Sequence, residues 1–203
     1  TLIAPKGVNR FARGPKDWRF KYDNVCSKLR SLHKSRFRIF IITNQLGIGK
    51  GFISRADFEA KMEIIAEHLH VPFTVLASIA EDEYRKPFTG LWDYLQAHCV
   101  DEHKLCVKTS IYVGDAAGRP SDIERSRMAD HSNCDLLFAE NIGLKFKTPE
   151  MYFNGDDVDY EDTLVRKSRE GIVKPVDEFV QTYFKGYTEI VLATHRSNVL
   201  NNI

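Results

Sequence analysis

Short apolar runs bounded by polar residues recur along the chain and predict buried strands. The clearest run is Phe37–Thr43 (FRIFIIT), which is nearly all apolar and β-branched. This composition is typical of a buried strand in a parallel sheet. The runs Phe73–Ser78, Ser110–Val113 and Asp135–Ala139 predict three further strands, and Glu189–Ala193 (EIVLA) predicts one more near the carboxyl end.

Apolar residues at helical spacing lie between these runs. A short helix ahead of the first strand is predicted by an apolar stripe at i, i+4 and i+7, formed by Val25, Leu29 and Leu32. Ser54, with Asp57 three residues later, resembles a helix start. One apolar face then continues through Phe58, Met62, Ile65 and Leu69. A helix is also expected at Leu91–Cys99. Strands alternating with helices predict an α/β fold: a doubly wound, mostly parallel sheet with helices on both faces.

Composition narrows the class of protein. The chain has 203 residues, 43% hydrophobic and 28% charged, and no apolar run approaches the roughly 20 residues that a membrane helix needs, so no membrane association is expected. Lys and Arg (29) nearly balance Asp and Glu (28), so any nucleic-acid binding would depend on local basic patches. The four cysteines show no zinc-ligand spacing and favour a reducing compartment.

Polar residues follow three of the predicted strands. Ligands of doubly wound sheets lie beyond the carboxyl ends of the strands, which draws attention to Thr43-Asn44-Gln45, Arg85-Lys86-Pro87 and Gly114-Asp115-Ala116. A carboxylate with small neighbours suits part of a Mg²⁺ site, a hydroxyl and amides can hold phosphoryl oxygens, and a lysine can neutralise a transferring phosphoryl group. The simpler alternatives are a helix-capping Asp, a Thr that ends a strand and a solvated Lys.

The glycines of Gly47–Gly51 do not form a known nucleotide-binding motif. A P-loop requires Gly where Asn44 stands and Ser or Thr where Gly51 stands. The dinucleotide fingerprint fails as well, because Phe52 occupies the position of its third Gly. A flexible loop that brings Lys50 near a phosphate-bearing substrate fits this segment better.

A hydroxyl, then a lysine, then Gly-Asp after successive strands is the order of motifs in the haloacid-dehalogenase superfamily. The chain resembles one family of it more closely, the phosphatase domain of eukaryotic polynucleotide kinase 3′-phosphatase, over roughly residues 1–153. The resemblance rests on Asp17-Trp18, ITNQLGIGKG (Ile42–Gly51), VPFTVLAS (Val71–Ser78), YRKPFTGLWDYL (Tyr84–Leu95), YVGDAAGRP (Tyr112–Pro120) and DLLFAENIGLKFKTPE (Asp135–Glu150).

The resemblance implies a site and a reaction. It implies removal of 3′-phosphates from damaged DNA ends by Mg²⁺-dependent aspartyl-phosphate chemistry. Asp115 matches the Mg²⁺ ligand, Thr43 the phosphate-binding hydroxyl and Lys86 the charge-stabilising lysine. Asn44 and Gln45 are expected to flank the phosphate, and Lys50, Arg85 and Arg119 to contact the DNA strand. Asp130 and Asp135 are left without a role.

The family's nucleophile belongs to an Asp-x-Asp-Gly-Thr motif, of which Thr1-Leu2-Ile3 resembles the continuation. We therefore expect the 203-residue chain to be inactive alone and to lack its first catalytic strand. Residues 154–203 are expected to form a linker and the possible start of a following kinase domain, although no P-loop follows Glu189–Ala193.

The resemblance also implies DNA ends bearing 3′-phosphate as partners, DNA-repair scaffold proteins as further ones, and a nuclear location, with cytoplasm or mitochondrion as alternatives. Two alternative functions stay open: a small-molecule phosphatase of the same fold, and a non-catalytic binding or scaffold protein.

Overall fold

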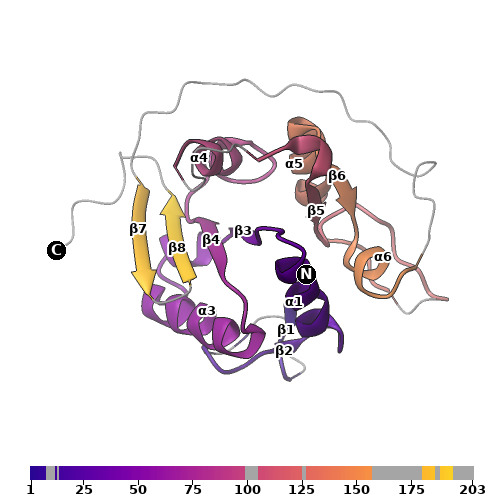
Figure 1. The fold of residues 1–203 in the computed structure, drawn as a ribbon, viewed down its shortest axis with the longest axis horizontal. Coiled ribbons are helices and arrows are strands. Elements are labelled where there is room, and N and C mark those ends of the chain that lie inside the picture. Colours follow the sequence, from indigo (N-terminus) through magenta and orange to yellow (C-terminus); the bar gives the residue numbers. More distant parts are fainter. Residues whose placement is uncertain are drawn as a thin grey trace. The chain divides into compact units, whose positions relative to one another are not determined.

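The computed structural model describes residues 1–7, 12, 14–98, 105–124, 127–156, 180–185 and 188–193. The chain divides into two compact units (Figure 1). The amino-terminal unit comprises Leu2–Arg85 with Val176–Ile203, and the central unit comprises Thr1 with Lys86–Pro175. Both contain parallel strand pairs and helices, which confirms the α/β class. The doubly wound arrangement stays a prediction.

The amino-terminal unit is built on a sheet with the strand order β3-β4-β8-β7. Strands β3 (Phe40–Asn44), β4 (Phe73–Ser78) and β8 (Thr188–Ala193) are parallel, and β7 (Val180–Lys185) is antiparallel to β8. In Figure 1 the yellow strand β8 lies next to β4, and the second yellow strand, β7, lies on the other side of β8. The strand predicted near the carboxyl end is therefore confirmed, whereas β7 was not expected.

The first predicted strand differs from β3 in two respects. Strand β3 begins three residues after Phe37, the predicted start, and Phe37 is 47% exposed. The residues of β3 are half-buried, whereas a buried strand was predicted. The position of β3 at one end of the strand order accounts for this. A strand at a sheet edge is covered less completely than a central strand such as β4, five of whose six residues are buried.

Three helices and a short strand pair complete the described part of this unit. They are α1 (Val25–Lys34), α2 (Leu46–Gly49), α3 (Arg55–Leu69) and the antiparallel pair of β1 (Ile3–Ala4) and β2 (Arg19–Phe20). Helix α3 starts as predicted, because the Ser54 hydroxyl accepts a hydrogen bond from the Asp57 N–H at 3.1 Å. Its four predicted apolar residues are all buried.

The glycine-rich segment after β3 is packed tightly against the end of β4. The Gln45 N–H donates to the Ser78 carbonyl oxygen at 2.6 Å. A Cβ atom added at Gly49 would come within 1.9 Å of the Ile79 carbonyl oxygen. Only glycine fits at this position, so packing explains one glycine that resembles part of a nucleotide-binding loop.

The described part of the central unit contains a parallel pair of short strands, three α-helices and a 3₁₀ turn. The elements are α4 (Gly90–His98), the 3₁₀ turn η1 (Val107–Thr109), β5 (Ile111–Val113), α5 (Cys134–Ile142), β6 (Lys145–Lys147) and α6 (Pro149–Phe153). Strand β5 pairs with β6 in parallel. The predicted helix after β4 and the predicted strand before Gly114 are both present.

The strand predicted at Asp135–Ala139 is wrong, since these residues lie in α5. Five consecutive apolar or acidic residues carry too little periodicity to separate a strand from a buried helix. The helix continues to Ile142 and ends at Gly143, whose φ of 86° provides a left-handed cap. The parallel partner of β5 is β6 instead, immediately after this turn.

Candidate active site

Lys86, Tyr112 and Asp135 form a buried polar cluster in the central unit. The Lys86 ammonium donates to Asp135 Oδ1 at 2.6 Å and to the Tyr112 hydroxyl at 2.9 Å. The Tyr112 hydroxyl in turn donates to the same Asp135 oxygen at 3.1 Å. The side chains of Lys86 and Asp135 are each only 8% exposed. Three segments that are far apart in sequence therefore meet at one oxygen atom of Asp135. Lys86 comes from the loop before Pro87, Tyr112 comes from β5, and Asp135 comes from the first turn of α5.

The charges of this cluster stabilise one another. Burial alone would lower the pKa of Lys86, but the interactions with Tyr112 and Asp135 outweigh it and hold that pKa above its ordinary value of 10.5. Burial raises the pKa of Tyr112 as well. Lys86 therefore stays a cation and Tyr112 a neutral donor throughout the physiological pH range.

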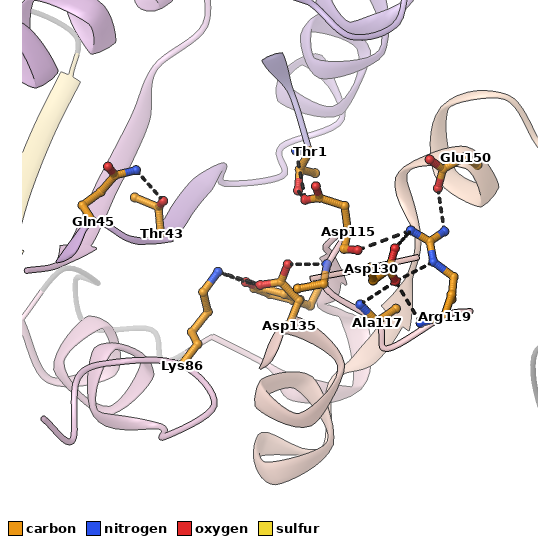
Figure 2. Close-up of polar contacts among 12 residues, drawn as sticks. Thr1, Thr43, Gln45, Lys86, Asp115, Ala117, Arg119, Asp130, Asp135 and Glu150 are labelled. Carbon is orange, nitrogen blue, oxygen red and sulfur yellow. Dashed lines mark hydrogen bonds and ion pairs between the residues drawn. The ribbon is translucent and has the colours of Figure 1, made fainter. Parts of the chain in front are cut away.

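The loop after β5 carries Asp115 and is fastened to the same cluster. The Ala116 N–H donates to Asp135 Oδ2 at 3.0 Å, and the Asp135 N–H donates to the Ala116 carbonyl oxygen at 3.0 Å. A Cβ atom at Gly114 would lie 2.5 Å from the Asp135 Cβ. Glycine at 114 therefore allows Asp135 to approach the loop, and Asp135 contacts both the lysine and the segment that presents Asp115 (Figure 2).

The Asp115 side chain itself is 41% exposed and contacts Thr1. Its Oδ1 accepts a hydrogen bond from the Thr1 hydroxyl at 2.6 Å and lies 3.0 Å from the Thr1 backbone nitrogen (Figure 2). Within the described residues, no group of three or more His, Cys, Asp or Glu side chains could hold a metal ion. Mg²⁺ commonly takes one or two carboxylates together with waters and substrate phosphate oxygens. Asp115 thus fits part of a magnesium site.

Arg119 lies in a second buried cluster, behind the Asp115 loop. Its guanidinium donates to both Asp130 oxygens at 2.8 and 3.0 Å, to Glu150 at 3.0 Å and to the Asp115 carbonyl oxygen at 3.3 Å. Asp130 Oδ2 also accepts from the backbone N–H groups of Ala117 and Arg119. The structure therefore places Arg119 where it supports the loop from inside. Its predicted contact with DNA stays a prediction.

Arg119→Met is expected to lower the free energy of unfolding by about 3 kcal/mol, measured by urea denaturation. The loss arises because the Asp130 carboxylate, 7% exposed, would stay buried without its nearest guanidinium partner, leaving only Arg127 at 3.9 Å among the described guanidinium groups. The matched control is Lys50→Met, which removes an exposed pair with Glu81 at 3.8 Å and should cost less than about 1 kcal/mol. Equal losses for the two variants would contradict the structural role.

The remaining predicted site residues lie in the amino-terminal unit. Thr43 and Asn44 end β3, and the Gln45 side-chain amide donates to the Thr43 hydroxyl at 3.0 Å (Figure 2). Lys50 caps α2. Arg85 carries a buried nitrogen, Nη1, that has no hydrogen-bond partner in the described part of the chain. The structure brings Thr43 into contact with Gln45. The roles of all five in phosphate or DNA binding stay predictions.

Sequence reasoning did not single out Tyr112 and gave no role to Asp130 or Asp135. One signal was available for Tyr112. Alternate residues of a strand point to the same face, so Tyr112 shares its face with Gly114, the residue that Asp135 approaches. The pairing of Asp135 with Lys86 spans 49 positions and has no local signature.

Comparison with known proteins gives consistent results. Residues 1–153 match the family model described as "Polynucleotide kinase 3 phosphatase". The chain is 38% identical over 156 residues to a "Bifunctional polynucleotide phosphatase/kinase" of Schizosaccharomyces pombe, covering 76% of this chain and 36% of that protein. It is 33% identical over 154 residues to "Polynucleotide 3'-phosphatase ZDP" of Arabidopsis thaliana, covering 69% of this chain and 21% of that protein.

A relative with another substrate in its name is also similar. Over 113 residues the chain is 30% identical to a "Probable D-glycero-D-manno-heptose-1,7-bisphosphate 7-phosphatase" of Thermoplasma volcanium, covering 52% of this chain and 74% of that protein. The chain thus spans about a third or less of the first two relatives, and most of the third. All three names include phosphatase activity.

Proposed function

The chain belongs to the polynucleotide kinase 3 phosphatase family, and from this premise we propose that it is the phosphatase part of a polynucleotide 3′-phosphatase. The main support for the proposal is that the Asp135 carboxylate accepts hydrogen bonds both from Lys86 and from the loop that presents Asp115. This arrangement sets a buried cation and an exposed carboxylate in one rigid cluster. A site for a phosphate dianion and a divalent cation needs these two charges.

The proposed reaction proceeds in two displacements. An aspartate carboxylate forms a bond to phosphorus while the bond from phosphorus to the 3′-oxygen breaks, and a second aspartate protonates that oxygen. Water then cleaves the aspartyl-phosphate and releases inorganic phosphate. The proposed role of Lys86 is to neutralise charge on the transferring phosphoryl group. Thr43, Asn44 and Gln45, which belong to the other unit, keep the phosphate-binding role that the family resemblance implies. Magnesium, held in part by Asp115, would supply further charge neutralisation.

The two reacting aspartates would belong to a strand that precedes Thr1. The contact of Thr1 with Asp115 supports this placement. The Thr1 nitrogen lies 3.0 Å from the Asp115 carboxylate, so a residue joined to that nitrogen would begin beside the proposed magnesium ligand. We call the chain preceded by an apolar strand ending Asp-x-Asp-Gly the extended chain.

Two other features support binding of an anionic, DNA-like substrate. The buried Arg85 Nη1 atom lacks a hydrogen-bond partner within the described residues, and an incoming phosphate oxygen would provide one. Lys50 is 53% exposed beside the glycine-rich turn, where it could contact a DNA strand. Repair-scaffold partners and a nuclear location remain part of the proposal and follow from the family resemblance only.

Substrate comparison tests the proposal. With Mg²⁺ present, the extended chain should release phosphate from a 3′-phosphorylated oligonucleotide at least about tenfold faster, as kcat/KM, than from heptose 1,7-bisphosphate, a difference of about 1.4 kcal/mol. The reverse preference would favour the small-molecule phosphatase that the Thermoplasma relative suggests. Binding of the oligonucleotide without turnover of either substrate would favour a scaffold protein.

A further inference from the structure

We propose that Tyr112 is a positioning residue for Lys86, an inference that rests on the proposed phosphatase function. The Tyr112 hydroxyl lies within hydrogen-bond distance of both members of the ion pair, 2.9 Å from the Lys86 nitrogen and 3.1 Å from Asp135 Oδ1. The resemblance to a known family gave Tyr112 no role. The function of Tyr112 would be to hold the Lys86 ammonium in one position.

The directions of the hydrogen bonds in the cluster are determined by chemistry. A lysine ammonium can only donate, so the Tyr112 oxygen accepts from Lys86. The single hydroxyl proton of Tyr112 is then directed to Asp135. Each bond consequently constrains the next, and the three groups form a closed ring with one arrangement of protons. A cyclic arrangement of this kind is mutually reinforcing in a low-dielectric interior.

A second contact is needed because an ion pair alone orients a lysine poorly. The ammonium is a compact charge on a flexible four-carbon stem and could pivot about Asp135 Oδ1 if that oxygen were its one anchor. The Tyr112 oxygen supplies a second anchor on a strand. The ring of Tyr112 is itself held by packing, with centroids 5.1 Å from Phe138 and 6.4 Å from Phe146.

Asp135 is in turn fixed at two points to the loop that presents Asp115. Its Oδ2 atom accepts from the Ala116 N–H, and its own N–H donates to the Ala116 carbonyl oxygen, both at 3.0 Å. Asp135 therefore holds the Lys86 ammonium at a fixed position relative to the Asp115 loop. The hydrogen bond to Tyr112 prevents the ammonium from pivoting about Asp135. Such positioning affects the transition state more than substrate binding, because a small misplacement of a charge weakens its stabilisation of the reacting phosphoryl group.

Tyr112→Phe tests the inference in the extended chain. This variant keeps the ring and its packing and removes both hydrogen bonds. We expect kcat on a 3′-phosphorylated oligonucleotide to fall by about tenfold, with KM changing less than about twofold. The matched control is Tyr152→Phe, which removes a half-buried hydroxyl from α6 of the same unit and should leave both parameters unchanged. A kcat within twofold of that of the unsubstituted chain would overturn the proposal.

A second measurement does not depend on activity. In the 203-residue chain, acylation of Lys86 by acetic anhydride is followed by mass spectrometry, with the exposed Lys50 as the internal standard. Tyr112→Phe should raise the Lys86 rate relative to Lys50 by about threefold or more, since the loss of a hydrogen bond frees the ammonium and destabilises its charged form. An unchanged ratio would overturn the positioning role. If no substrate is hydrolysed but the ratio rises, the proposed function fails and the contact between Tyr112 and Lys86 stands.

Discussion

Asp115→Asn should lower the magnesium-dependent 3′-phosphatase rate of the extended chain by at least about a hundredfold, equivalent to roughly 2.7 kcal/mol of transition-state stabilisation. Asparagine has nearly the shape of aspartate but carries no charge, so it would hold a divalent cation poorly. Because the Asp115 side chain is 41% exposed, the substitution should change the unfolding free energy by less than about 1 kcal/mol. Initial rates measured over a magnesium titration, with urea unfolding in parallel, separate these two effects.

The matched control for this substitution is Asp122→Asn, which removes the charge of another aspartate in the same unit and leaves its backbone pairing with Arg127 in place. It should leave both the rate and its magnesium dependence within about twofold of the parent values, as is usual away from a catalytic group. A near-parental rate for Asp115→Asn at low magnesium would remove Asp115 from the proposed site. Loss of folding in that variant would instead show that the carboxylate is structural.

The 203-residue chain should release no phosphate above background, whereas the extended chain should turn over at an ordinary enzymatic rate, on the order of 1 s⁻¹ or more. The physical reason is that the proposed roles of Lys86, Thr43 and Asp115 are charge neutralisation, phosphate binding and magnesium binding, and none of the three is the nucleophile of the proposed reaction. The measurement is phosphate release from a 3′-phosphorylated oligonucleotide with equal concentrations of the two proteins and saturating Mg²⁺.

A control distinguishes the effect of the added nucleophile from the effect of the added strand on the stability of the fold. The extended chain with Asn in place of its first added aspartate should fold as the parent does and remain inactive. If that variant is active, or if the 203-residue chain alone turns over the oligonucleotide, the nucleophile lies elsewhere in the chain. The proposal that the strand precedes Thr1 would then be withdrawn.

The sequence predicted correctly those helices and strands whose apolar residues recur at regular spacing or whose ends carry a capping residue. Helix α3 combines a Ser54 cap with a regular apolar stripe, and both are present in the structure. Strand β4 is a six-residue, mostly apolar run, and its bounds match the prediction. Helix α5 was mistaken for a strand, because its amino-terminal five residues have no period and the helix depends on packing by Phe138 and a cap at Gly143.

The site shows the same division between local and distant information. Asp115 and Lys86 could be singled out because each follows a strand or a recognisable motif. The residues that form hydrogen bonds around the site could not be predicted from local sequence. Asp135 lies 49 positions from Lys86, and Glu150 lies 31 positions from Arg119. The expected contact of Arg119 with DNA stays a prediction, and the fold gives its guanidinium two carboxylate partners, the buried Asp130 and the partly exposed Glu150.

The contact between Thr1 and Asp115 has a practical consequence for anyone who purifies this protein. An affinity tag or a retained protease scar joined to Thr1 would leave the fold 3.0 Å from the Asp115 carboxylate. Handles for isolation or surface immobilisation belong at the opposite terminus, and titrations of divalent cations should be compared between proteins whose first residues are identical.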